Sequence, residues 1–385
     1  MKIDNSVRDL HESMRSLFHW NHLKDGATYE KSYIYCLDIL LSLRQDCNSM
    51  YGDEDFDTWL GRKDHKEQFE KYKWIFTHPD KELITGLAYL FAEDYLDRYR
   101  EGHGSKSKVY QDYINDFIFN NDEEFENVVD MNSRYLENIF SLKPVLKNTC
   151  GGADQTVNLY HLTEFPIAYK TIEFLNAVWG YNMEIVKQHY VHGDLPELKG
   201  KTLYIGELTK SDCMTIPSKW KGKANDFIAY SRDDRTGSDV LNLVHYLINA
   251  QPDSTGVFLV NKYMLNRHNH TFQQLRKRLV GDFLMGIIQI SENHCMLVLK
   301  RQANKCKCCD QSTSIEDRLP VIRVGNIDYY ERQSLIQELL SRKNQNIADY
   351  LDKERKVSTM RLDRKQILRD GYSAHQIELP VLAIR

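Results

Sequence analysis

The residues of this chain that could bind a metal are grouped at Cys306, Cys308 and Cys309, with His294 and Cys295 a short distance before them. Thiolates and imidazoles are the usual zinc ligands, but a structural zinc site generally needs two spaced pairs, such as two Cys-x-x-Cys units. Here a single cluster stands in a hydrophilic segment without a second pair. We therefore predict a loop of reduced thiols and no metal site.

A second group of residues could contact phosphate. Between Lys262 and Arg278 the chain carries several cations together with His268 and His270, and His245 lies further upstream. Basic side chains of this kind bind nucleic-acid backbones. Charge runs are also common on the solvated face of a helix outside an α/β sheet, and this second interpretation is favoured.

Several motifs with well-understood chemistry are absent. The chain contains no GxxxxGK[ST], GxGxxG, HExxH or GxSxG. Their absence argues against a P-loop NTPase, a common dehydrogenase, a zincin and an α/β-type serine hydrolase.

Composition predicts a globular protein with a sizeable core. The 385 residues are 42% hydrophobic and 28% charged, with only 8 prolines. The net charge of −4 does not point to nucleic-acid binding by itself. No apolar run reaches the roughly 18 residues of a membrane span, and the charged start has no signal-peptide core. We expect a cytoplasmic protein without a membrane partner, in which the eight cysteines are reduced.

The pattern of apolar residues in the sequence changes near residue 150. Before it, apolar residues recur every three to four positions, which predicts a helical domain over residues 1–145 that includes Tyr33–Leu43 and Leu83–Tyr99. After it, β-rich runs alternate with helices. We expect strands at Thr202–Ile205 and Asp226–Ala229 and a helix at Val240–Ile248, in a mostly parallel sheet with helices on both faces.

The stretch from Gly256 to Arg301 is the most regular part of the chain. It predicts a strand, a basic amphipathic helix and two strands facing each other, which together would close one edge of the sheet. The expected ranges are Val257–Val260, Thr271–Val280, Leu284–Ile290 and Cys295–Leu299. An α/β domain over residues 146–301 would then be followed by an extension over 302–385, with a strand at Pro320–Val324 and a long helix at Tyr330–Tyr350.

Several short segments follow one another in a characteristic order. They are Tyr29-Glu30-Lys31 before an apolar helix, Glu164 and Pro166 before Asn176 and Gly180, Gly206-Glu207-Leu208 after a strand, Leu275-Arg276-Lys277 within a helix, the Leu297–Lys300 strand, Ile322–Asp328, and Val357–Pro380. This order resembles the modification (methyltransferase) subunit of type I restriction–modification systems, an adenine-N6 DNA methyltransferase family.

The resemblance implies a fold, a cofactor and partners. The fold would be α/β: a helical N-terminal domain, a Rossmann-like sheet of the S-adenosylmethionine-dependent methyltransferase type, and a C-terminal helical tail. The cofactor would be S-adenosyl-L-methionine. Glu164, after the second strand, would receive its ribose, because a carboxylate there can accept from both hydroxyls. Gly206 and Glu207 would lie near its adenine amine. DNA and the specificity and restriction subunits would be the partners.

The chain departs from the family where the chemistry should be. The family carries Asn-Pro-Pro-aromatic after its fourth strand, where the amide and a proline carbonyl accept from the adenine amine and the ring stacks on the flipped base. With Asp226–Tyr230 taken as that strand, the matching residues are Ser231, Arg232, Asp233 and Asp234. The family's cofactor-binding glycine motif is matched only weakly, by Cys150-Gly151-Gly152.

Two functions are compatible with this pattern. The first is a catalytically degenerate methyltransferase-like subunit that binds or regulates within a restriction–modification or phage-defence system. The alternative is an active adenine-N6 methyltransferase. The changes at 231–234 favour the first, and whether the chain is an enzyme stays open at this point.

Overall fold

The computed structural model describes residues 12, 14–16, 18–19, 31–34, 36–37, 125–131, 158–163, 183–187, 198–209, 213–216, 218, 221–228, 235–252, 254–266, 270–301, 318–324, 327–341, 347–354 and 356–363. The chain divides into two units, Met1–Ser105 with Phe165–Met183, and Lys106–Glu164 with Glu184–Arg385. In the first unit the described residues between Met1 and Ser105 are helical and bury Met14, Phe18 and Tyr33.

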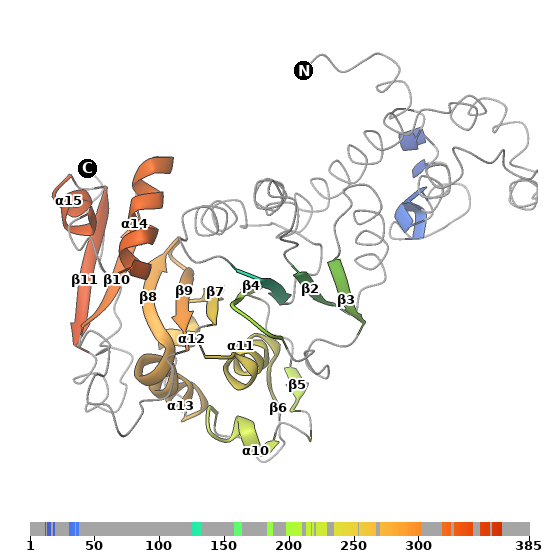
Figure 1. The fold of residues 1–385 in the computed structure, drawn as a ribbon, viewed down its shortest axis with the longest axis horizontal. Helices are drawn as coiled ribbons and strands as arrows, with labels where there is room; N and C mark the ends of the chain where they lie inside the picture. The colour runs from blue at the N-terminus through green and yellow to red at the C-terminus, as the bar shows by residue number, and fades with distance from the viewer. Residues whose placement is uncertain are drawn as a thin grey trace, which may run out of the picture. The chain divides into compact units, whose positions relative to one another are not determined.

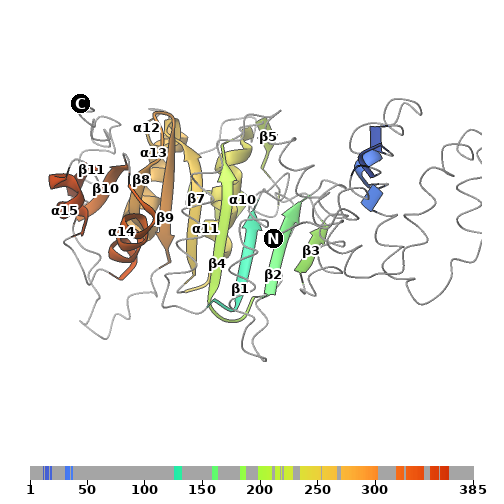
Figure 2. The same ribbon diagram turned by 90° about the horizontal axis from the view of Figure 1, so that it is seen from above.

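A nine-stranded sheet forms the body of the second unit, in the order β11-β10-β8-β9-β7-β4-β1-β2-β3 (Figure 2). The strands are β1 (Asn127–Met131), β2 (Asn158–Thr163), β3 (Met183–Lys187), β4 (Thr202–Leu208), β7 (Thr255–Asn261), β8 (Leu284–Gln289), β9 (His294–Lys300), β10 (Arg318–Val324) and β11 (Val357–Asp363). β9 runs antiparallel between β7 and β8, and β11 pairs antiparallel with β10. The pairs β1–β2, β1–β4, β4–β7 and β8–β10 are parallel.

The order of the strands creates a switch point between β1 and β4. From β1 the chain moves outward on one side through β2 and β3, and then returns to the other side of β1 as β4 and β7. The strands that follow β1 and β4 in the chain therefore lie on opposite sides of this point. In open α/β sheets such a point is where ligands bind.

Helices lie on both sides of the sheet. Figure 1 shows α11 (Ser238–Asn249) and α13 (His270–Arg278) against one face and α14 (Tyr329–Ser341) on the other. The second unit also contains the short helices α10 (Lys221–Ala224), α12 (Tyr263–Asn266) and α15 (Ile347–Lys353), and the π-helical turn η2 (Leu279–Phe283). None of the described helices is long and apolar enough to cross a membrane.

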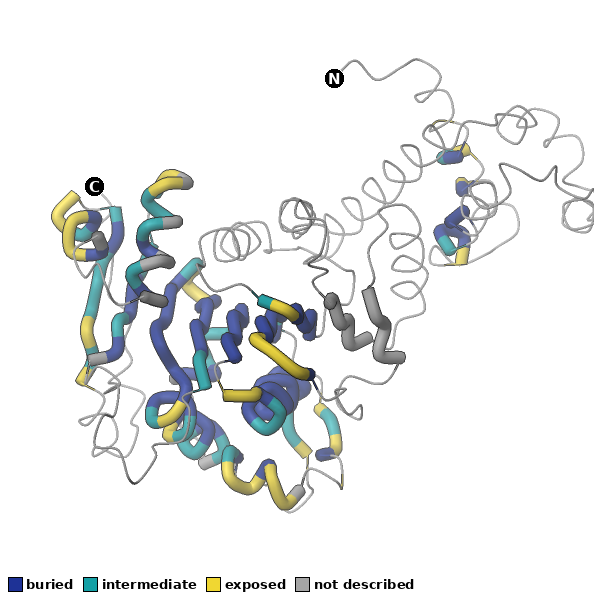
Figure 3. Tube along the Cα trace, viewed as in Figure 1, coloured by how far each residue is buried: buried dark blue, intermediate teal, exposed yellow. Residues whose placement is uncertain are grey.

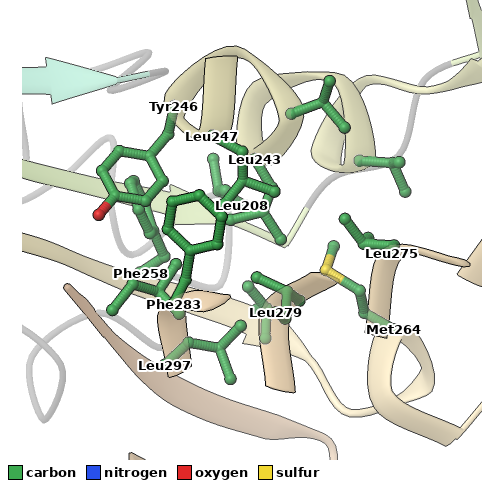
Figure 4. Packing of buried hydrophobic residues seen from close by; sticks show 14 of the residues in the cluster. Leu208, Leu243, Tyr246, Leu247, Phe258, Met264, Leu275, Leu279, Phe283 and Leu297 are labelled. Carbon is green, nitrogen blue, oxygen red and sulfur yellow. The ribbon is translucent and has the colours of Figure 1, made fainter. Parts of the chain in front are cut away.

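The core is formed where the central strands meet α11, α13 and η2. β4 and β7 are buried on both faces, as Figure 3 shows, and this explains why their sequences are almost continuously apolar. Leu208, Tyr246, Phe258, Leu279 and Leu297 pack together from five different elements (Figure 4). Full burial of each such side chain contributes about 1.5–3 kcal/mol relative to exposure.

Most of the elements expected after residue 250 are present. The strands predicted at 257–260, 284–290 and 295–299 are β7, β8 and β9, and the helix predicted at 271–280 is α13 with η2. The β8–β9 pair does not close the sheet, because β10 and β11 extend it beyond β8. The single long helix expected at 330–350 is two helices, α14 and α15.

Two differences change the assignment of strands. β1, between β4 and β2 in the sheet, lies within the range expected to be helical. The strand expected at Asp226–Ala229 is absent through Ile228. Residues 225–227 form a turn after α10, with the Phe227 and Ile228 amides donating to the Ala224 carbonyl, each at 2.9 Å. Phe227 and Ile228 are apolar because they pack against the core, with Ile228 fully buried.

Candidate functional site

The carboxyl ends of β1 and β4 pack closely against each other at the switch point. Gly206 of β4 lies so close to β1 that a Cβ atom built on it would stand 2.4 Å from the Met131 carbonyl oxygen. Only glycine permits this approach, because any side chain would push the two strands apart. Gly206, predicted as a cofactor residue, therefore has a packing function that the structure displays directly.

Glu207 follows Gly206 and is half-buried near the end of β4. The hydroxyl of Thr209 donates a hydrogen bond of 2.9 Å to its Oε1 atom. This contact orients the carboxylate at the edge of the sheet where a ligand is expected.

Asn261 connects the next strand to the same place. It is the last residue of β7, and its Nδ2 atom donates a hydrogen bond of 2.6 Å to the main-chain carbonyl of Thr209. The ladder between β4 and β7 brings the two segments together, since Leu208 is in register with Val260. The carboxyl ends of β4 and β7 are thus joined by side chains as well as by the ladder.

Asp130 is a buried acid on the other side of the switch point. It is the penultimate residue of β1, is 0% exposed, and stands in register with Ile205 of β4. A buried carboxylate is costly unless its neighbours stabilise it, so such groups often mark functional positions. Our sequence reasoning missed Asp130 because the whole region was expected to be helical. The short run Asn127–Met131, in which three of the residues are valine or methionine, was the available signal.

A second acid marks the start of α11. Asp239, 0% exposed, lies in the first turn of this helix, where the helix dipole favours negative charge. The Tyr263 hydroxyl donates a hydrogen bond to its Oδ2 atom. The Tyr263 ring packs edge-on against Phe272, with centroids 5.8 Å apart and an interplanar angle of 83°. The segment after β7 is therefore fixed to both α11 and α13.

The connection from β4 to α11 leaves from this edge and returns to it. Its two ends pair as the short antiparallel ribbon of β5 (Cys213–Thr215) and β6 (Arg235–Gly237). In between, the turn at 225–228 is held by α13: Gln274 Nε2 donates to the Asn225 carbonyl at 2.6 Å, and Arg278 Nε to the Asp226 carbonyl at 2.8 Å. The Arg278 guanidinium also lies 5.9 Å from the centroid of the Phe227 ring.

The other predicted site residues fall at or beyond the limits of the described residues. Glu164 comes directly after β2, which ends at Thr163, but lies outside the described residues itself. Ser231, Arg232, Asp233 and Asp234 lie outside them, as do Gly151 and Gly152, which stand shortly before β2 in the sequence and not directly after β1.

The residues considered for a metal site are also only partly described. Cys306, Cys308 and Cys309 lie outside the described residues. His294 Nδ1 hydrogen-bonds to the Ser291 hydroxyl at 3.0 Å. Burial raises the pKa of the Cys295 thiol to about 12, although the charge of Lys262 opposes the shift. The thiol is therefore protonated at neutral pH. Nowhere in the described ranges do three His, Cys, Asp or Glu side chains gather as metal ligands would.

The same fold occurs in methyltransferases of known structure. A putative class I S-adenosylmethionine-dependent methyltransferase from Listeria monocytogenes matches with a TM-score of 0.53 and 11% identity, over 90% of this chain and 99% of that chain. The methyltransferase subunit of a type I restriction–modification system from Streptococcus thermophilus gives a TM-score of 0.51 and 12% identity, over 97% and 92%. A structure on the complex assembly of the type I restriction–modification system gives 0.52 and 10%, over 99% and 90%.

These matches confirm the predicted fold class and the predicted structural resemblance. The chain has the α/β fold of S-adenosylmethionine-dependent methyltransferases, including type I modification subunits. No protein-family model matches the sequence, and no curated protein matches it either.

Proposed function

We propose that this chain is a methyltransferase-like subunit of a DNA restriction–modification or phage-defence system, and that it acts by binding or regulation without transferring methyl groups to adenine. One observation carries the proposal. In the order of the chain the fourth strand of the sheet is β4, which ends at Leu208, and the sequence over its end and just beyond it is Glu207-Leu208-Thr209-Lys210. The family that the sequence resembles carries Asn-Pro-Pro-aromatic after its fourth strand.

The residues at the end of β4 are poorly suited to hold an adenine for methylation. Such a site must accept hydrogen bonds from the exocyclic amine and must stack a ring on the base. The carboxylate of Glu207 can accept a hydrogen bond, but Leu208, Thr209 and Lys210 offer no aromatic ring. The segment first considered, Ser231–Asp234, offers none either. The loss of the motif is therefore common to both placements.

The carboxyl ends of the strands carry residues that are suited to the cofactor. S-adenosyl-L-methionine carries an adenine amine, which donates hydrogen bonds, and a half-buried carboxylate held in one orientation, such as Glu207, accepts them well. Glu164, next to the end of β2, would supply a second carboxylate. The sequence directly after β1, Asn132-Ser133-Arg134, contains no glycine for close approach to the cofactor. When bound, the cofactor would supply an activated methyl group.

The partners follow from the assemblies in which this fold is found. One structural neighbour belongs to a study of the assembly of a type I restriction–modification system. We propose that this chain likewise associates with DNA and with specificity and restriction subunits. Nothing in the sequence resembles a target-recognition domain, so a separate subunit would select the DNA sequence.

Calorimetric titration with S-adenosyl-L-methionine tests whether the pocket is retained. We expect the wild-type chain to bind, and we expect Glu207→Ala to weaken binding at least about tenfold, because a hydrogen bond to a charged group is worth about 1.5–3 kcal/mol. Glu354→Ala is the matched control, since Glu354 is an exposed acid after α15. Absence of heat with the wild type would contradict the cofactor site, and equal affinities of wild type and Glu207→Ala would contradict the part assigned to Glu207.

A further inference from the structure

We infer that Thr209 and Asn261 are positioning residues that set the orientation of the Glu207 carboxylate for a ligand at the switch point; this inference rests on the proposed cofactor site. Neither residue was singled out by sequence, and neither belongs to a recognisable motif. What identifies them is a connected series of contacts from β7 to Glu207.

The first contact acts on Glu207 itself. A glutamate side chain rotates about three bonds, and at the edge of a sheet it would populate several orientations. The Thr209 hydroxyl donates to Oε1 at 2.9 Å, which is within the normal range for a hydrogen bond between oxygens. This contact favours the orientations in which the carboxylate lies over the end of β4. A ligand then meets a carboxylate that is already ordered, which lowers the entropic cost of binding.

The second contact holds Thr209. This residue is the first after β4 and begins the long connection to α11, where the strand ladder no longer fixes the backbone. The 2.6 Å hydrogen bond from Asn261 Nδ2 to the Thr209 carbonyl replaces that constraint. Because Asn261 ends a strand whose six preceding residues are buried, the anchor is rigid. Through Asn261 and Thr209, β7 therefore constrains the orientation of Glu207.

Variants that conserve side-chain shape distinguish a positioning role, which affects binding of the ligand through Glu207, from a role in stability alone. Thr209→Val keeps the branched shape and removes the hydroxyl, whereas Thr209→Ser keeps the hydroxyl and removes a methyl group. Asn261→Leu keeps the branch at Cγ and the number of side-chain heavy atoms, and removes the donor. Each variant is measured by calorimetric titration with S-adenosyl-L-methionine and by thermal unfolding, in the wild-type background and, for Thr209→Val, also in a Glu207→Ala background.

We expect Thr209→Val and Asn261→Leu to weaken binding about tenfold, and Thr209→Ser to bind within about twofold of wild type. In the Glu207→Ala background Thr209→Val should weaken binding no further, because no carboxylate is left to orient. Wild-type affinity of Thr209→Val, or a full additional loss in the Glu207→Ala background, would overturn the inference.

The outcomes also separate this inference from the proposed function. If the wild type binds, Glu207→Ala loses affinity and Thr209→Val does not, only the positioning inference fails. If the wild type gives no heat, the cofactor site and the positioning inference fail together, while the absence of methyl transfer remains to be judged by its own assay.

Discussion

The side-chain amide of Asn261 donates a hydrogen bond of 2.6 Å to the main-chain carbonyl of Thr209, and so joins the end of β7 to the first residue after β4. On the other side of β4, Gly206 lies against the Met131 carbonyl of β1. The carboxyl end of β4 is thus fixed from both neighbouring strands. Glu207 stands between these two constraints, at the switch point of the sheet.

The close approach of β1 and β4 predicts that Gly206→Ala is strongly destabilising. Its Cβ would stand 2.4 Å from a backbone oxygen, which cannot rotate away as a side chain can. We expect the free energy of unfolding in urea to fall by about 2 kcal/mol or more. Gly222→Ala in α10 is the control, because a Cβ there meets nothing within 4 Å; it should change stability by less than about 1 kcal/mol. Equal effects of the two substitutions would contradict the tight β1–β4 contact.

The second half of the sheet could be predicted from sequence because its elements are long and regular. β7, β8 and β9 are apolar runs of six or seven residues, and α13 has helical periodicity with three basic residues in its last turn. Local pattern and tertiary structure agree there. β1 has only five residues and follows an acidic segment, so local pattern did not reveal it.

The candidate site could be predicted only in part. Glu207 was selected by resemblance as an acid after a strand, and the structure places it on β4, next to β1. The position of the family's catalytic motif was predicted at 231–234 because the run 226–230 was interpreted as the fourth strand. Within it, Phe227 and Ile228 are apolar because they pack against the core, with the Phe227 and Phe283 ring centroids 6.4 Å apart. Periodicity over so few residues cannot distinguish these two causes.

Because α13 holds the 225–228 turn through Arg278, we expect substitution of Arg278 to destabilise the protein more than substitution of the adjacent Lys277. Arg278 hydrogen-bonds to the Asp226 carbonyl and lies near the Phe227 ring, whereas Lys277 is exposed. Arg278→Ala should lower the free energy of unfolding by about 1 kcal/mol and speed amide exchange at Phe227 and Ile228. Lys277→Ala should stay within about 0.5 kcal/mol of wild type. Unchanged exchange rates in Arg278→Ala would show that α13 does not hold the turn.

The hydrogen bond between Tyr263 and Asp239 predicts that removal of one hydroxyl group lowers the stability of the protein strongly. Tyr263→Phe removes one hydroxyl and leaves the fully buried Asp239 carboxylate without that donor. We expect a loss of about 2–3 kcal/mol in thermal or urea unfolding. Tyr350→Phe, at a tyrosine that is 54% exposed, serves as the matched control and should be nearly neutral. A neutral Tyr263→Phe would mean that this hydrogen bond does not support the start of α11.

Two buried tyrosines predict sensitivity to alkaline pH. Burial raises the pKa of Tyr204 from 10.0 to about 12, and burial together with the nearby Tyr204 raises the pKa of Tyr246 as well. The folded state thus holds these protons more tightly than the unfolded state. Their contribution to stability is complete below pH 10 and is lost as pH rises from 10 towards 12, by about 2–3 kcal/mol for Tyr204.

Urea unfolding at a series of pH values, with phenolate absorbance followed in parallel, measures this effect. Tyr204→Phe keeps the ring that packs edge-on against Tyr246 at 5.1 Å, and should reduce the slope above pH 10. Titration of all tyrosines near pH 10 in the native protein would contradict the prediction.

The central claim is that the end of β4 no longer supports methylation of adenine, and methyl transfer measures it most directly. Purified chain is incubated with unmethylated duplex DNA and labelled S-adenosyl-L-methionine, beside an active adenine-N6 methyltransferase as positive control. We predict no label in N6-methyladenine above the protein-free background, because Glu207-Leu208-Thr209-Lys210 supplies no ring to stack on the base. Repeated turnover that yields labelled N6-methyladenine would contradict the account.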